Sequence, residues 1–272
     1  MLLAGSAPFT AFAAVLAALF VATLAILHRR ARESIRIQRR KLFDGCFALF
    51  DHVTLTQDDV AFPVLTGSYR GHSVRIEPIV DQVVFRQVPS LWLTVSVRQS
   101  LPVAGTFDLL ARRANVEFWS HADALPLCVP LPRDWPDHTS LKSDREASEL
   151  PLCILGPHVR TLFSDPRSKE LVVMPRGVRI VYQVQAADRS EYLVLRRATF
   201  HGAQVSVALL ESLLERATAV CADLMQGSVH LHNGLALAAR RAERKDCDEA
   251  NTRCIREEHD AAIGPSGGQP LE

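Results

Sequence analysis

The sequence predicts an α+β protein, in which an N-terminal transmembrane helix precedes one or more antiparallel sheets packed by a long C-terminal helix. Three observations support this class. No charged residue occurs from Met1 to Leu27. Short runs rich in Val, Ile, Leu and aromatic residues, separated by turn residues, fill much of residues 60–197. Apolar residues then recur at three- and four-residue spacing over residues 203–226. The two strand-rich blocks also suggest a divergent twofold repeat.

The apolar run from Pro8 to Leu27 predicts a membrane anchor over residues 1–28. A helix of about 20 residues rises about 30 Å, the thickness of the bilayer hydrocarbon. A cleavable signal peptide is the alternative. No basic segment precedes the run, and the run is longer than the usual apolar region of about 7–15 residues in such peptides. We therefore expect an uncleaved anchor.

A basic cluster follows the anchor and predicts its orientation. Only Glu33 offsets these charges, and the positive-inside rule keeps such a cluster in the cytoplasm. We expect a single-pass membrane protein, with the N-terminus outside and the main domain cytoplasmic. The expected membrane-interface residues are Arg29, Arg30, Arg32, Arg36, Arg39, Arg40 and Lys41.

The cluster also divides the charge of the chain, whose total is +1. Residues 1–41 carry a net charge of +6, so the remainder carries −5. Anionic lipid headgroups attract a basic segment of this kind, which makes membrane lipids the first expected partner. The distal domain lacks the basic excess of a nucleic-acid-binding protein, so we expect no nucleic-acid partner.

Residues 33–53 have a helical apolar pattern and predict that a basic juxtamembrane helix occupies residues 29–55. An α+β cytosolic domain then follows over residues 56–230. Its first block predicts a meander of three or four strands: Val60–Thr66, Ser73–Val80, Val83–Val88 and Leu91–Arg98. Residues 106–113 suit either a strand or a short helix.

Residues 120–150 contain four prolines and a charged patch, and predict a linker. A short helix over Pro157–Phe163 opens the second block. Three strands are expected next, at Glu170–Met174, Val178–Gln185 and Glu191–Arg197, and then the helix over residues 203–226. A charged, partly disordered tail is expected over residues 231–272.

Six cysteines are present and none has Cys-x-x-Cys spacing. In a cytosolic domain they should be reduced, and their spacing does not suit a zinc site. The apolar surroundings of Cys46, Cys153 and Cys221 predict small core residues.

Several short motifs resemble those of a loose group of bacterial proteins. They are the turn Gly67-Ser-Tyr-Arg-Gly71, the segment Gly105-Thr-Phe-Asp108, the turn Val159-Arg-Thr-Leu162 and the strand Glu170–Met174. Proteins of this group have one N-terminal span, a cytosolic α+β domain and no assigned activity. The resemblance covers roughly residues 60–225. It implies a bacterial inner-membrane location and carries over no functional residue.

No local motif for catalysis, a cofactor or a metal occurs in the sequence, so we expect no catalytic, cofactor-binding or metal-binding residue. His230 and His232 are read as surface residues after a helix. The polar and aromatic rim of the first hairpin, Tyr69, Arg70 and His72, is a candidate surface for a ligand or partner.

Two functions remain open, with enzymatic activity uncertain and less favoured. The first is a membrane-anchored, non-enzymatic domain that binds a membrane protein partner as a scaffold or regulator. The alternative is a lipid-binding or apolar-ligand-binding domain tethered to the bilayer, with a pocket between the sheet and the helix over residues 203–226. An enzyme whose site is assembled from distant residues would leave no local motif.

Overall fold

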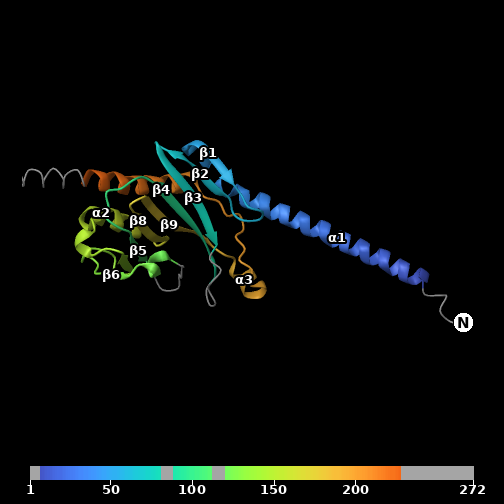
Figure 1. Ribbon diagram of the computed structural model, residues 1–272. Helices are drawn as coiled ribbons and strands as arrows, with labels where there is room; N and C mark the ends of the chain where they lie inside the picture. The colour runs from blue at the N-terminus through green and yellow to red at the C-terminus, as the bar shows by residue number, and fades with distance from the viewer. Residues whose placement is uncertain (1–6, 81–87, 112–119, 228–272) are drawn as a thin grey trace, which may run out of the picture. The chain divides into compact units, whose positions relative to one another are not determined.

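The computed structural model describes residues 7–80, 88–111 and 120–227, and within them the chain is α+β. Its strands form a single antiparallel sheet of nine strands in the order β1-β2-β3-β4-β9-β8-β5-β7-β6 (Figure 1). The strands are β1 (Asp51–Thr56), β2 (Val64–Tyr69), β3 (His72–Val80), β4 (Ser90–Arg98), β5 (Phe107–Ala111), β6 (Leu127–Val129), β7 (Thr139–Ser143), β8 (Ser168–Met174) and β9 (Gly177–Ala186). The bounds of β3, β4, β8 and β9 agree with the sequence prediction to within about two residues.

Pairing of β4 with β9 joins the two strand blocks. Leu93 lies opposite Tyr182, and Val95 lies opposite Ile180. The blocks therefore belong to one sheet, and the twofold repeat is not shown. The segment predicted as a linker is part of this sheet, because β7 pairs with β5 and β6 pairs with β7.

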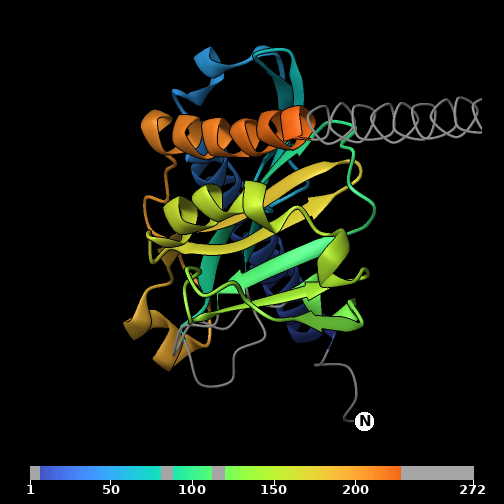
Figure 2. The ribbon, with the colours of Figure 1, turned by 90° about the vertical axis from the view of Figure 1, so that its left-hand side faces the viewer.

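Two helices cover one face of the sheet, as Figure 2 shows. They are α2 (Leu152–Phe163) and the helix over residues 207–227. Both contribute an apolar stripe to one continuous core with the strands. Burial of such stripes is the main stabilising term of a helix-on-sheet layer. The fully or almost fully buried helix residues are Leu155, Val159, Leu162, Phe163, Leu210, Leu213, Leu214, Ala217, Val220, Cys221 and Leu224.

The helix α1 (Ala7–Arg40) contains the apolar run and ends before the predicted juxtamembrane helix does. Two 3₁₀ turns follow, Lys41–Phe43 and Cys46–Leu49, and then β1. Gly45, at φ +88°, lies between the turns in a left-handed conformation that stops a helix. The apolar pattern there arises because Leu42, Phe43 and Cys46 are buried in the core, not because the segment is helical.

No other described part of the protein covers the apolar side chains of α1 from Phe12 to Leu27. The large ones from Phe12 to Leu27 are 49–65% exposed. Among the described residues, α1 is the one helix that is long and apolar enough to cross a membrane, judged by its length and composition.

The predicted strand Glu191–Arg197 is wrong, since this segment begins instead with the short helix α3 (Arg189–Leu195). Asp188 caps the helix by accepting a hydrogen bond from the Glu191 backbone N–H at 3.0 Å. Four other expectations lie outside the described residues: most of the strand Val83–Val88, the two histidines at 230 and 232, Cys247 with Cys254, and the disordered tail.

Candidate binding groove

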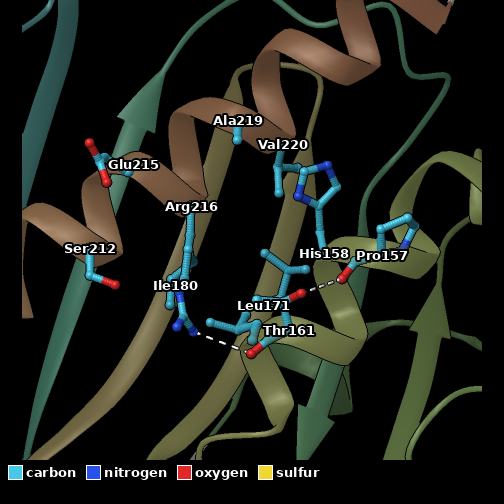
Figure 3. Close-up of a pocket in the computed structure, with 11 residues that line it drawn as sticks. Pro157, His158, Thr161, Leu171, Ile180, Ser212, Glu215, Arg216, Ala219 and Val220 are labelled. Carbon is cyan, nitrogen blue, oxygen red and sulfur yellow. Dashed lines mark hydrogen bonds between the residues drawn. The ribbon is translucent and has the colours of Figure 1, made fainter.

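A groove lies between α2 and the helix over residues 207–227, with strands β8 and β9 as its floor (Figure 3). Its volume is about 450 Å³. That volume is in the range of small-molecule sites, which are about 300–1,000 Å³. Apolar side chains make most of its lining and a few polar ones stand at its edge. The lining residues are Pro157, His158, Thr161, Leu162, Leu171, Ile180, Ser212, Glu215, Arg216, Ala219 and Val220.

Local sequence explains why the walls of the groove leave this space. The helix over residues 207–227 is capped by Ser206, whose Oγ accepts from the Leu209 N–H at 3.3 Å. On its groove side this helix carries the small residues Ser212 and Ala219, which do not fill the gap to α2. Leu171 and Ile180 lie beneath the groove and are fully buried, so the lining residues above them provide the surface that is open to a ligand.

Two polar links cross between the helices. Arg216 donates through Nη1 to the Thr161 carbonyl oxygen at 3.4 Å, as Figure 3 shows. His158 Nε2 lies 2.7 Å from Asp223 Oδ2. The open surface of the groove is thus mainly apolar with cationic and polar groups at its edge, an arrangement that suits a ligand with an apolar body and a polar end.

The hairpin residues singled out from the sequence lie near this site, but in different environments. Tyr69 is the last residue of β2 and is buried, packed edge-on against Phe50 with ring centroids 6.3 Å apart. Arg70, at φ +48°, stacks over the Tyr69 ring at 5.0 Å and pairs with Glu215 at 2.9 Å.

Arg70 is therefore brought to the groove through Glu215, which lines it. Burial raises the pKa of the Tyr69 hydroxyl. His72 begins β3 opposite Tyr69 in the strand register and is partly exposed. That these three residues form a recognition surface stays a prediction.

The predicted membrane-interface cluster lies on the last turns of α1, and part of it contacts the domain. Arg32 pairs with Asp59, and Arg36 lies 3.9 Å from Glu33. Arg39 donates to the Val60 carbonyl and stacks over the Phe62 ring at 4.7 Å. Arg29, Arg30 and Arg40 are exposed, as is Lys41 at the start of the first 3₁₀ turn. Contact of the cluster with lipid stays a prediction.

The opposite face of the sheet carries a buried acidic pair. Asp108 on β5 and Glu170 on β8 are 1% and 2% exposed, and Ser120 hydrogen-bonds to both carboxylates. Burial and the nearby Glu170 charge raise the pKa of Asp108 to about 8. A carboxyl group with such a pKa is mostly protonated at pH 7. Because both carboxylates are enclosed in the sheet layer, the pair contributes to the pH dependence of folding and not to the groove.

His158, Glu215, Arg216 and Asp223 were not predicted as site residues. The sequence holds a signal for Glu215 and Asp223 alone: residues 211, 215, 219 and 223 recur every four positions beside the apolar stripe, so they share a flank of the helix. That spacing alone does not show that α2 lies opposite. The fit of α2 to the flank depends on tertiary packing.

The cysteines follow the sequence prediction only in part. Cys46 and Cys221 are buried and free. Cys153 was predicted to be a core residue, but it is free and exposed on α2. It lies two positions before Leu155, on the helix face that points away from the sheet.

Comparison of the chain with protein families and with curated proteins finds no match in either case. The functional argument therefore rests on the geometry described above.

Proposed function

We propose that the protein is a membrane-tethered binding domain whose groove between α2 and the helix over residues 207–227 takes the apolar part of an amphipathic small molecule, such as a lipid. The single observation that carries this proposal is the cavity of about 450 Å³ with a mainly apolar lining. This cavity lies between the two helices, above a helix–sheet core whose residues are fully or almost fully buried. The polar edge, with His158 and Arg216, suits the polar end of such a ligand.

The proposal includes a single-pass topology in the inner membrane, in which α1 spans the bilayer and the domain faces the cytoplasm. Two observations support it. The apolar half of α1 is exposed, and the basic cluster follows it directly. The domain binds the last turns of the same helix through Arg32 and Arg39. Protease digestion of sealed vesicles, with a tag at the C-terminus, tests the orientation. The mass of the membrane-extracted chain tests cleavage.

The groove is tested by filling it. Ala219 lines the groove and is exposed to it, so Ala219→Phe adds bulk where the ligand would lie. Ala222 lies three positions later on the same helix, is exposed and does not line the groove, so Ala222→Phe is a matched control. The full chain is extracted from membranes in mild detergent, and bound lipid is measured by native mass spectrometry.

We expect lipid to copurify with the wild type and with Ala222→Phe, and to fall at least tenfold with Ala219→Phe. Equal lipid in all three proteins would contradict the proposal. Binding of a protein partner, the other hypothesis from the sequence, stays a second proposal. It predicts that cross-linking in native membranes recovers a stoichiometric protein and that Ala219→Phe leaves lipid content unchanged.

A further inference from the structure

The short helix α3 exposes three consecutive large apolar side chains. Leu193, Val194 and Leu195 are 57%, 79% and 64% exposed. Among the described residues outside α1, no other large hydrophobic residue exceeds 40% exposure. Single exposed apolar residues are ordinary on a protein surface, whereas a contiguous group marks a contact site.

Hydrogen bonds hold α3 out from the sheet as a closed loop. The Asp188 N–H donates to the Thr199 carbonyl at 2.9 Å, so the two ends of the loop meet. Just after the loop closes, His201 Nε2 lies 2.8 Å from Oε1 of Glu191 on α3. These contacts hold in place the helix that exposes the apolar group.

The segment that follows α3 lies against the domain end of α1 (Figure 1). Arg197 and Ala198 share a small cavity with Ile35 and Arg39 of α1. Phe200 packs edge-on against Phe62, whose ring lies under the Arg39 guanidinium. This places α3 next to the helix that we propose to span the membrane.

The geometry lets α3 reach the headgroup layer. Ile35 lies eight residues after Leu27, which is about 12 Å along a helix. Val194 lies three residues before Arg197, so their Cα atoms are at most about 10 Å apart. The headgroup layer adds about 5–7 Å beyond the hydrocarbon on each side.

We propose that α3 is a second membrane contact, in which Leu193, Val194 and Leu195 enter the bilayer interface beside α1. The inference rests on the proposed anchoring by α1. Charge favours a lipid surface as the contact of α3, because the exposed residues Arg189, Arg196 and Arg197 flank the apolar group. Apolar side chains bordered by arginine are the pattern of elements that lie in an anionic membrane interface.

The test uses the full chain reconstituted into phosphatidylglycerol–phosphatidylcholine vesicles that contain brominated lipid, which quenches tryptophan on contact. Val194→Trp reports on α3 and Val21→Trp reports on α1. Leu127→Trp is the matched control, because Leu127 is an exposed apolar residue on β6, the strand at the opposite edge of the sheet from β1. Quenching is measured as the increment over the wild-type protein.

We expect strong added quenching at position 21, clear quenching at position 194 and none at position 127. Quenching at 21 with none at 194 overturns the inference and leaves the anchor standing. No quenching at 21 overturns the anchor and the inference with it. An unquenched position 194 that photo-cross-links to another membrane protein overturns the lipid contact in favour of a protein contact.

Discussion

Arg70 and Glu215 form an ion pair of 2.9 Å between the tip of the β2–β3 hairpin and the helix over residues 207–227. The two residues are 145 positions apart in the chain. Their side chains are 61% and 49% exposed, so water screens the attraction. The pair therefore orients Glu215 at the groove more than it stabilises the fold.

A double-mutant cycle of Arg70→Ala and Glu215→Ala measures this pair. We expect a coupling free energy of about 0.2–1 kcal/mol, which is typical of exposed ion pairs. Chemical unfolding of the full chain in detergent, at low and high salt, gives the coupling. A coupling well above that range, or one that does not fall with salt, would show that the pair is desolvated.

Part of the fold follows from local patterns in the sequence. Strands β3, β4, β8 and β9 are visible as alternating or apolar runs between turn residues, because one face of each strand must be buried. The strand order is not visible. The pairing of Val95 with Ile180 joins residues far apart in the chain, and no local pattern encodes a distant partner.

The segment 191–197 shows how a local pattern can predict the wrong element. Its apolar run Leu193–Leu195 resembles a strand, but the Asp188 cap starts a helix, and the run is exposed and not paired. The place of the groove was missed for a related reason: the sequence predicts a pocket between the sheet and the helix over residues 203–226, whereas the groove lies between that helix and α2. Its residues come from α2, β8, β9 and the helix over residues 207–227, and no one of these elements carries a recognisable motif.

Gly177 is expected to be the most sensitive glycine in the sheet. It begins β9 at φ +141°, and an added Cβ would lie 2.0 Å from the Val97 carbonyl oxygen on β4. Because that oxygen belongs to the backbone of a strand in the middle of the sheet, it cannot move away without distorting the sheet. We expect Gly177→Ala to lower the free energy of unfolding by more than about 3 kcal/mol, measured by urea titration.

Gly71→Ala is the matched control. Gly71 also has a positive φ, +82°, but nothing lies within 4 Å of its added Cβ. Only the conformational cost remains, so the expected loss is about 1 kcal/mol. Equal losses for the two variants would show that backbone conformation, and not the contact with β4, limits both sites.

The raised pKa of Asp108 predicts that the free energy of unfolding falls as the pH rises through the neutral range. Its pKa is raised from 3.8 to about 8 by burial and by the Glu170 charge, while Ser120 and Arg179 act in the opposite direction. Between those values the folded state holds a proton that the unfolded chain has released. The free energy of unfolding therefore decreases with rising pH across this window.

Asp108→Asn removes the titrating proton and keeps a donor at the same position. We expect the variant to lose much of the pH slope between about pH 5 and about pH 8 and to gain up to a few kcal/mol at the alkaline end. The measurement is the urea midpoint as a function of pH. Asp58→Asn, at an exposed aspartate, is the control and should retain the wild-type slope. An unchanged slope in Asp108→Asn would show that Asp108 is ionised in the folded protein.

The cysteines give a test of which helix faces are buried. Burial raises the pKa of the Cys221 thiol to about 11, and burial together with Asp44 raises the pKa of Cys46. A thiol must be exposed and deprotonated to react, so these two should resist alkylation in the folded protein. Of the four cysteines that the structure describes, Cys128 and Cys153 are exposed and should be labelled before the other two. Peptide mass spectrometry after timed iodoacetamide treatment measures the labelling of each site, with a denatured sample as the reference for full reactivity.

Rapid labelling of Cys221 would mean that the helix over residues 207–227 separates from the sheet. The groove between this helix and α2 would then open and close, and it would not persist as a fixed cavity.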